Sequence, residues 1–108
     1  MEKHAKVVII GGGVVGCSIL YHLSKFGLKD CILLERNELT SGSSWHAAGN
    51  VHVISSDPNI SRMMAYTIGL YKEIEKESGH STGFKPSGGF YLASNEVWAE
   101  YLLSLIHI

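Results

Sequence analysis

Residues 7–16 read VVIIGGGVVG, and this stretch decides the fold of the chain. Its continuous apolar, β-branched start predicts a strand over residues 6–10 that is covered on both faces, and the glycines predict that a tight turn ends it. Residues 14–26 then carry apolar side chains at helical spacing and stop at Gly27, which predicts a helix. A second apolar strand is expected over residues 30–35. The sequence therefore predicts a β-α-β unit with parallel strands and a right-handed crossover.

The glycines that follow the first strand are spaced as Gly11-x-Gly13-x-x-Gly16. Between a strand and a helix, with an acidic residue about 20 positions on, this spacing is typical of a dinucleotide-binding site. Gly11 permits the tight turn, Gly13 lets a diphosphate approach the backbone, and Gly16 lets the helix pack close to the sheet. The N–H groups near Val14 and Val15 would then point at the diphosphate, assisted by the helix dipole.

Glu35 closes the second expected strand and supplies that acidic residue. Its carboxylate can accept hydrogen bonds from both hydroxyls of an adenosine ribose, and it disfavours NADP because it would repel a 2′-phosphate. We expect Arg36 to lie beside the adenosine half, although an arginine near this position can also accommodate that phosphate. These residues leave FAD and NAD both open. The following loop of small and hydroxyl residues favours FAD, because a simple NAD domain would soon begin another strand and helix.

Composition limits the other possibilities. The chain has 108 residues, is 45% hydrophobic and 18% charged, and carries a net charge of −1. This balance indicates one globular domain at most, and it favours neither nucleic-acid binding nor disorder. The longest apolar stretch, residues 7–17, is too short and too rich in glycine for a membrane span. The two cysteines of the chain, Cys17 and Cys31, make no disulfide framework, and no Cys/His spacing predicts a metal site.

The rest of the chain predicts helices and irregular segments. Residues 37–50 are expected to form a loop that enters a short helix at residues 46–48. Asp57 has the position of an N-cap for a helix that Gly79 ends, and Ser94 has the position of an N-cap for a final helix. Only two strands of a parallel sheet are evident. We therefore expect an α/β fold that is the incomplete N-terminal part of a doubly wound, Rossmann-like domain.

The segment Gly42-Ser43-Ser44-Trp45-His46-Ala47-Ala48-Gly49 carries a more specific signal. Together with the glycine fingerprint, it resembles the FAD-dependent amine oxidoreductases that include D-amino-acid oxidase. It is similar above all to the sarcosine and dimethylglycine dehydrogenases among them. The likeness covers nearly all of residues 5–102 and includes residues 88–95.

The resemblance implies that His46 carries FAD covalently, because the histidine of the Trp-His-Ala-Ala-Gly run does so in those dehydrogenases. Asn50 departs from the leucine usual in the relatives. The full set of cofactor-binding residues implied by the fingerprint and the resemblance is Gly11, Gly13, Val14, Val15, Gly16, Glu35, Arg36, Gly42, Ser43, Ser44, Trp45, His46, Ala47, Ala48, Gly49 and Asn50.

The resemblance also implies an activity: hydride transfer from an N-methyl amine, such as sarcosine or dimethylglycine, to FAD. An electron acceptor, the catalytic residues and a possible folate-binding region would lie outside this chain. Three alternatives stay open: an amino-acid oxidase with non-covalent FAD, a non-catalytic regulatory relative, and an NAD-linked dehydrogenase. The early start of the first strand favours a bacterial cytoplasm, whereas a mitochondrial matrix protein would need a longer N-terminus.

The last six residues suggest a foreign origin. The string CTG-TCT-CTT-ATA-CAC-ATC, a transposon end used to fragment DNA for sequencing, encodes Leu103-Ser104-Leu105-Ile106-His107-Ile108. We interpret residues 103–108 as an adapter-encoded tail and residues 1–102 as the native part of the FAD-binding domain. An ordinary apolar helix end is the alternative, and the codons of the source DNA would distinguish the two.

Overall fold

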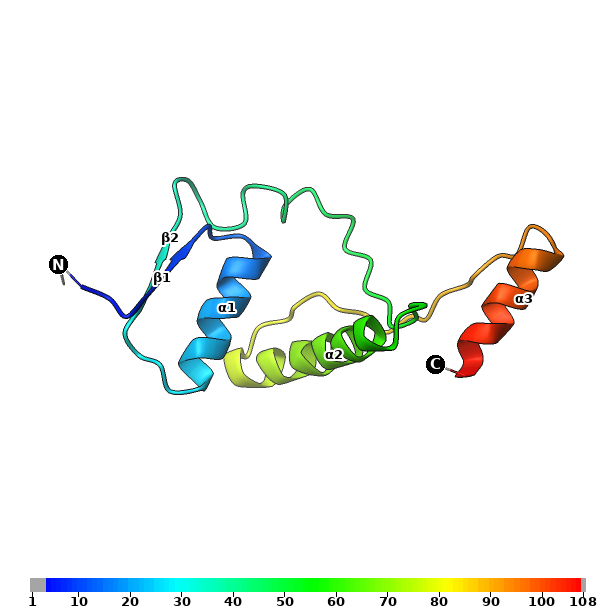
Figure 1. Cartoon of the computed structure of the whole chain (residues 1–108). Helices are drawn as coiled ribbons and strands as arrows, with labels where there is room; N and C mark the ends of the chain where they lie inside the picture. Colours follow the sequence, from blue (N-terminus) through cyan, green and yellow to red (C-terminus); the bar gives the residue numbers. More distant parts are fainter. Residues whose placement is uncertain (1–3, 108) are drawn as a thin grey trace. The chain divides into compact units, whose positions relative to one another are not determined.

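The computed structural model describes residues 4–107, which form two units that divide after Asn50. Figure 1 labels the main elements along the chain. The first unit contains β1 (Val7–Ile10), α1 (Val14–Lys25) and β2 (Cys31–Leu34), and the second contains α2 (Pro58–Ser78), α3 (Glu96–Ser104) and a 3₁₀ turn (Leu105–His107).

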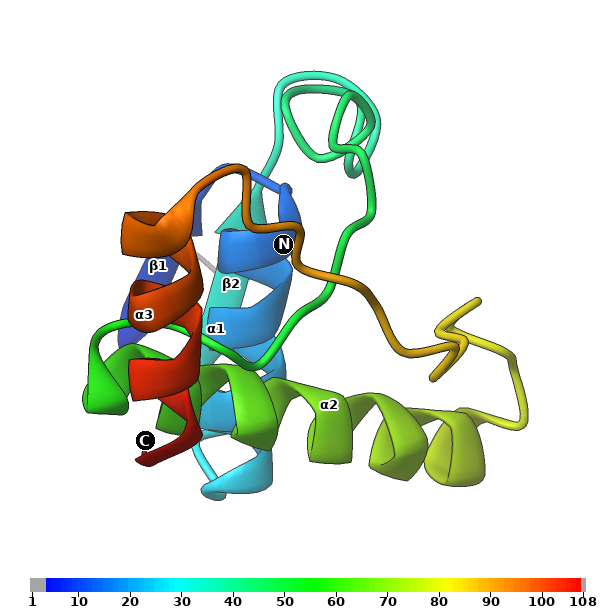
Figure 2. The same ribbon diagram turned by 90° about the vertical axis from the view of Figure 1, so that its right-hand side faces the viewer.

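The first unit is the expected β-α-β unit. The strands β1 and β2 pair in parallel, with Val7 opposite Cys31 and Ile10 opposite Leu34. The crossover helix α1 lies alongside both strands in Figures 1 and 2. The strand, helix and strand predicted from the sequence are therefore confirmed, with ends that differ by no more than one residue.

Burial of the strands on both faces, however, is not found in the described residues. Ile9 of β1 is buried at 8% exposure, but its neighbour Ile10 is 86% exposed. One helix can cover only one face of a sheet, and two strands leave both outer edges unpaired. The unit thus has the elements of a doubly wound domain without the layers that would bury them.

The loop after β2 is a series of turns over residues 39–46 that is followed by irregular chain. The short helix expected over residues 46–48 is wrong. The last turn closes with the Ala47 N–H on the Ser44 carbonyl at 3.4 Å, and Gly49 then takes a left-handed φ of 73°. A left-handed residue terminates helical geometry, so no helix propagates from His46.

In the second unit, α2 begins and ends where the sequence predicts. The Asp57 carboxylate accepts the N–H groups of Asn59 at 2.7 Å and Ile60 at 3.2 Å, as an N-cap does. Gly79 ends the helix with a left-handed φ of 71°, and its N–H donates to the Glu75 carbonyl at 2.9 Å. Both terminal signals are confirmed.

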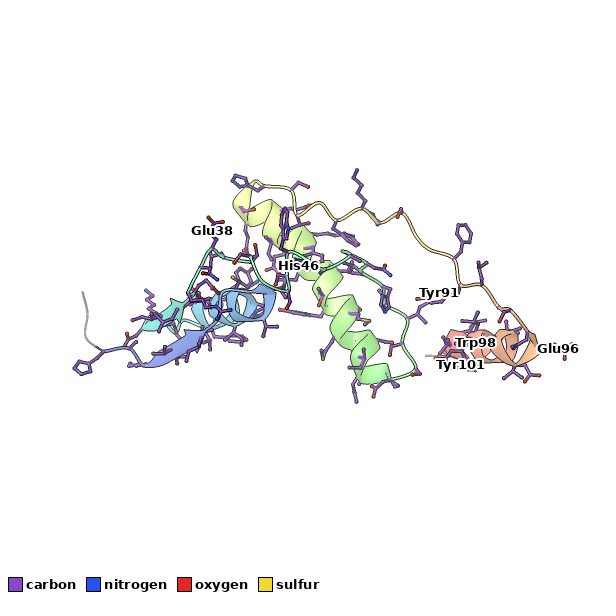
Figure 3. The ribbon with its side chains drawn as sticks, turned by 90° about the horizontal axis from the view of Figure 1, so that it is seen from above. Glu38, His46, Tyr91, Glu96, Trp98 and Tyr101 are labelled. Atoms are coloured by element: carbon purple, nitrogen blue, oxygen red, sulfur yellow. The ribbon has the colours of Figure 1, made fainter. Side chains whose placement is uncertain are left out.

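The N-cap of α3 is Asn95 rather than Ser94. The Asn95 side chain accepts the N–H of Trp98 at 2.9 Å, which is the bond of a cap to the third helical residue. Figure 3 labels Trp98 and Tyr101 on α3, and their rings make an edge-to-face contact at 5.6 Å. The helix extends into the expected tail through Ser104, whereas Ile108 lies outside the described residues.

The segment that follows α2 is held to it by Glu75 and Tyr71. The Glu75 carboxylate accepts the N–H of Thr82 at 2.7 Å and its hydroxyl at 2.8 Å. These bonds lower the pKa of Glu75 below its usual value, because they stabilise the ionised form. The ring of Tyr71 contacts that of Phe84 at 5.8 Å. No helix within residues 4–107 is both long enough and apolar enough to span a membrane.

Candidate functional site

The glycine-rich loop, residues 11–13, lies where β1 gives way to α1. Gly11 has a φ of 105°, which L side chains rarely adopt, and its N–H donates to the Leu34 carbonyl at 2.8 Å. A Cβ on Gly16 would overlap the carbonyl oxygen of Gly11. The first and last glycines of the fingerprint thus have the structural roles expected of them: the turn and the close approach of helix to strand.

The N-terminus of α1 offers backbone donors. The first intrahelical bond joins the Cys17 N–H to the Gly13 carbonyl at 3.0 Å, so the N–H groups of Val14, Val15 and Gly16 have no intrahelical acceptor. They stand at the positive end of the helix dipole, and the side chains of both valines are exposed. Such a helix end suits an anion such as a diphosphate.

Ser44 reaches this helix end from the loop after β2. Its Oγ accepts the Val14 N–H at 2.8 Å, across 30 residues of sequence. The N–H that was expected to bind the diphosphate at Val14 therefore bonds to Ser44 instead, and those of Val15 and Gly16 are left for an anion. Gly13, the N-cap residue, has no side chain to do so. A Cβ on Gly13 would lie 3.2 Å from the same hydroxyl, so glycine also leaves space for Ser44.

Glu35 is hydrogen-bonded to the middle residue of the glycine-rich loop. Its two carboxylate oxygens accept the N–H groups of Gly12 at 2.7 Å and of Asn37 at 2.9 Å. The bond from Gly12, then that from Asn37, and more weakly the charge of Arg36 lower the pKa of Glu35. The carboxylate is therefore ionised at neutral pH, and each oxygen keeps a lone pair for a ribose hydroxyl.

Gly12 is a residue whose role the fingerprint does not predict. A Cβ there would lie 2.5 Å from Leu39 Cδ2 and 3.0 Å from the Cβ of Glu35. Its carbonyl accepts the Thr40 N–H at 2.9 Å. The signal in the sequence is the middle glycine of the Gly11-Gly12-Gly13 run, since the Gly-x-Gly spacing leaves that position free and only a close contact requires glycine there.

Residues 39–46, which we call the His46 turn, bring His46 into this region; Figure 3 labels its side chain. The turn is closed by the Trp45 N–H on the Thr40 carbonyl at 3.0 Å. The Nδ1 atom of His46 lies 3.0 Å from the Gly42 carbonyl oxygen. Because a carbonyl only accepts, this bond places the proton of a neutral imidazole on Nδ1 and leaves the lone pair on Nε2.

The other predicted contacts follow along the same loop. Ser44 is half-buried, whereas the remaining residues of the segment are exposed. These exposed residues are Gly42, Ser43, Trp45, His46, Ala47, Ala48, Gly49 and Asn50. Their contacts with a cofactor remain predictions. No cluster of three His, Cys, Asp or Glu side chains suited to a metal ion occurs in the part of the chain that the structure describes.

The donors and acceptors of the first unit fit a dinucleotide. N–H groups at a helix end follow the glycine-rich loop, and the ionised Glu35 is hydrogen-bonded to Gly12 within it. The first suit a diphosphate, and the second suits the hydroxyls of a ribose.

Comparisons with known proteins agree with this geometry. The chain is 46% identical over 96 residues to human mitochondrial dimethylglycine dehydrogenase and 44% identical over 96 residues to human mitochondrial sarcosine dehydrogenase. These alignments cover 89% and 88% of this chain but only 11% and 10% of the relatives. It is also 38% identical over 108 residues to the mitochondrial regulatory subunit of mouse pyruvate dehydrogenase phosphatase, covering 100% of this chain and 12% of that protein.

The chain thus spans about a tenth of the length of the curated relatives that it matches. A family model described as "FAD dependent oxidoreductase" (DAO) matches residues 6–107. The expected resemblance is therefore confirmed, and FAD is the dinucleotide that the family implies. This chain belongs to the DAO family of FAD-dependent oxidoreductases.

Proposed function

We propose that the intact protein containing this chain oxidises the C–N bond of an N-methyl amine of the sarcosine or dimethylglycine type, with FAD bound covalently through His46. The observation that carries the proposal is the place of His46. It lies on a turn that is hydrogen-bonded to Gly12 of the glycine-rich loop through Thr40 and to Val14, the first residue of α1, through Ser44. The identity to two dehydrogenases named for these amines supports the substrate class.

Different residues of the first unit would bind different parts of FAD. The N–H groups of Val15 and Gly16, with the helix dipole, would hold the diphosphate. Glu35 would accept the ribose hydroxyls while its bonds from Gly12 and Asn37 keep it in place. When bound, FAD supplies a hydride acceptor, and a histidyl bond would make it a stronger one by withdrawing electron density from the ring.

His46 has the orientation that such a bond requires. The Gly42 carbonyl holds Nδ1 at 3.0 Å, which directs the free lone pair of Nε2 away from the turn. Neutral imidazole is a nucleophile near physiological pH. We therefore assign Nε2 as the atom that would carry the flavin. Its bond to the 8α methyl carbon of the flavin would replace one C–H bond of that methyl group, with the proton leaving to solvent and the electron pair passing to the flavin ring, which is itself the oxidant.

The rest of the reaction belongs to parts of the intact protein outside these residues. A group that binds the substrate carboxylate, a catalytic base, the site of an electron acceptor and a folate-binding region are all expected there. We accordingly propose that residues 4–107 alone have no turnover.

The experiment is acid precipitation of the intact protein, followed by flavin fluorescence of the washed pellet. We expect fluorescence in the wild-type pellet and in His52→Ala, a control histidine in the same loop region. We expect none in His46→Ala, whose flavin would stay in the supernatant. A colourless wild-type pellet with a yellow supernatant would contradict the covalent bond and favour a non-covalent FAD oxidase of the same family.

A second candidate is a non-catalytic regulatory protein. The observation in its favour is the alignment to the mouse regulatory subunit, which covers 100% of this chain. Anaerobic addition of sarcosine or dimethylglycine separates the two. An amine dehydrogenase loses the absorbance of oxidised flavin, whereas a regulatory protein retains it with either amine.

A further inference from the structure

We propose that Ser44 is a positioning residue: with the backbone of Thr40, it fixes the His46 turn on the glycine-rich loop and on the first residue of α1. The inference rests on the proposed function in one respect, that His46 is the residue to which FAD becomes attached. It adds that the site of attachment is positioned relative to the N-terminus of α1, where the diphosphate is expected, by two hydrogen bonds between distant residues of the first unit.

The first point of attachment is the backbone of Thr40. Its N–H donates to the Gly12 carbonyl at 2.9 Å, and its own carbonyl accepts the Trp45 N–H at 3.0 Å. Thr40 is the one non-glycine residue with positive φ, at 65°, in the described chain. A β-branched residue rarely adopts this conformation, so the surrounding contacts must impose it.

The second point of attachment is the Ser44 hydroxyl. It accepts the Val14 N–H at 2.8 Å and is half-buried, in contrast to the exposed residues on either side of it. An N-cap is ordinarily the residue that precedes its helix. Here the cap comes from 30 positions away, so the bond fixes tertiary placement as well as the helix end.

His46 follows Ser44 by two residues and is tied back to the turn by Gly42. Both ends of the turn, near Thr40 and at Ser44, therefore meet residues that flank the expected diphosphate position. A dinucleotide whose diphosphate is held at α1 can reach only a limited distance with its reactive ring. A histidine that must meet that ring needs a fixed distance from α1, and the two hydrogen bonds provide it.

The test compares three variants of the intact protein. Ser44→Ala removes the acceptor for Val14, and Ser44→Thr keeps a hydroxyl. Ser41→Ala is the matched control, because the Ser41 hydroxyl bonds only locally, to the carbonyl of Glu38 three residues earlier, at 2.8 Å. Each FAD-free protein is mixed with increasing FAD, and the rate at which acid-stable flavin appears is extrapolated to saturating FAD. Saturation removes any effect of Ser44 on FAD affinity.

We expect the maximal rate to fall about tenfold or more in Ser44→Ala, since small displacements of reacting groups cost up to ~100-fold in rate. We expect Ser44→Thr to restore most of it and Ser41→Ala to match the wild type. In the FAD-free proteins, amide hydrogen exchange at Val14 and across the His46 turn should quicken in Ser44→Ala alone. Unchanged exchange of the β1 amides would show that this variant is folded.

A wild-type maximal rate in Ser44→Ala, or a loss confined to FAD affinity, would overturn the proposal. So would a loss of equal size in Ser41→Ala. A wild-type protein that forms no acid-stable flavin would instead refute the covalent bond of the proposed function. In that case the hydrogen-exchange comparison alone decides whether Ser44 holds the turn.

Discussion

Different kinds of contact stabilise the two units of the chain, each within itself. In the first unit, the hydrogen bonds from Gly12 to Glu35 and from Val14 to Ser44 join residues 23 and 30 positions apart. In the second, the side-chain bonds described above join near neighbours, and the widest, at Glu75, spans 7 positions. The first unit takes its form from pairings across the sequence, and the second takes it from helix ends and adjacent turns.

This difference separates what a substitution does in each unit. Distant pairings depend on close approach, so an added methyl group at a glycine of the first unit disturbs several elements together. In the second unit, a helix end depends only on residues next to it in the sequence. The described part of α2 also contains no buried residue, so a substitution there disturbs little else. The same substitution can therefore have opposite effects in the two units.

The largest expected contrast is between Gly16→Ala and Gly69→Ala. The first places a Cβ on the carbonyl of Gly11, which must separate α1 from β1, whereas the second finds no atom within 4 Å. We expect Gly16→Ala to cost about 3 kcal/mol or more and to abolish FAD binding, since backbone cannot move aside as a side chain can. We expect Gly69→Ala to stabilise α2 by about 0.5–1 kcal/mol through helix propensity.

Native-state hydrogen exchange of the two helices in the intact protein measures both effects, and FAD titration measures binding. Equal losses for the two variants would show that helix packing, and not the close approach at Gly16, determines the response.

A smaller effect tests the contact between Gly12 and Leu39. We expect Gly12→Ala to destabilise the first unit by about 1–2 kcal/mol, because its Cβ would lie 2.5 Å from Leu39 Cδ2. Leu39→Ala removes that obstacle, so the double variant should regain about half of the loss. Exchange of the β2 amides gives the stability of each variant. A double variant as unstable as Gly12→Ala would mean that the neighbouring Glu35 sets the limit.

The smallest expected effects are changes in stability at low pH. The pKa values of Glu35 and Glu75 both lie below their usual value of 4.5, because backbone N–H groups bond to the ionised carboxylates. Each group therefore adds stability that is complete above about pH 4.5 and is lost as the pH falls through its lower folded value. In Glu35→Gln and in Glu75→Gln, the stability should therefore fall less steeply as the pH is lowered. Amide hydrogen exchange measured over a series of acidic pH values checks this.

The two carboxylates should differ at neutral pH. Glu35→Gln should weaken FAD binding, because the amide donates where the ribose hydroxyls need an acceptor. Glu75→Gln lies in the second unit and should leave the affinity for FAD unchanged. A similar loss of affinity for FAD in both variants would contradict the assignment of Glu35 to the binding site.

Much of the local structure could be predicted because its causes are local. The apolar runs and Gly27 predicted β1, α1 and β2, and Asp57 and Gly79 predicted the ends of α2. The cap of α3 was misplaced by one residue, since Ser94 and Asn95 are both good caps and only the helix start selects between them. The short helix expected over residues 46–48 was wrong because Gly49, directly after it, has a left-handed φ, which ends helical geometry.

The sequence by itself determined the family, the β-α-β order and the residues expected at FAD, because glycine spacing and strand or helix periodicity are written along the chain. Only the tertiary structure decided why the middle glycine is needed, why Thr40 takes a left-handed φ and where Ser44 bonds. The reason is physical. These three features depend on atoms of residues about 30 positions apart that meet only after the strands have paired, and no local pattern records such a meeting.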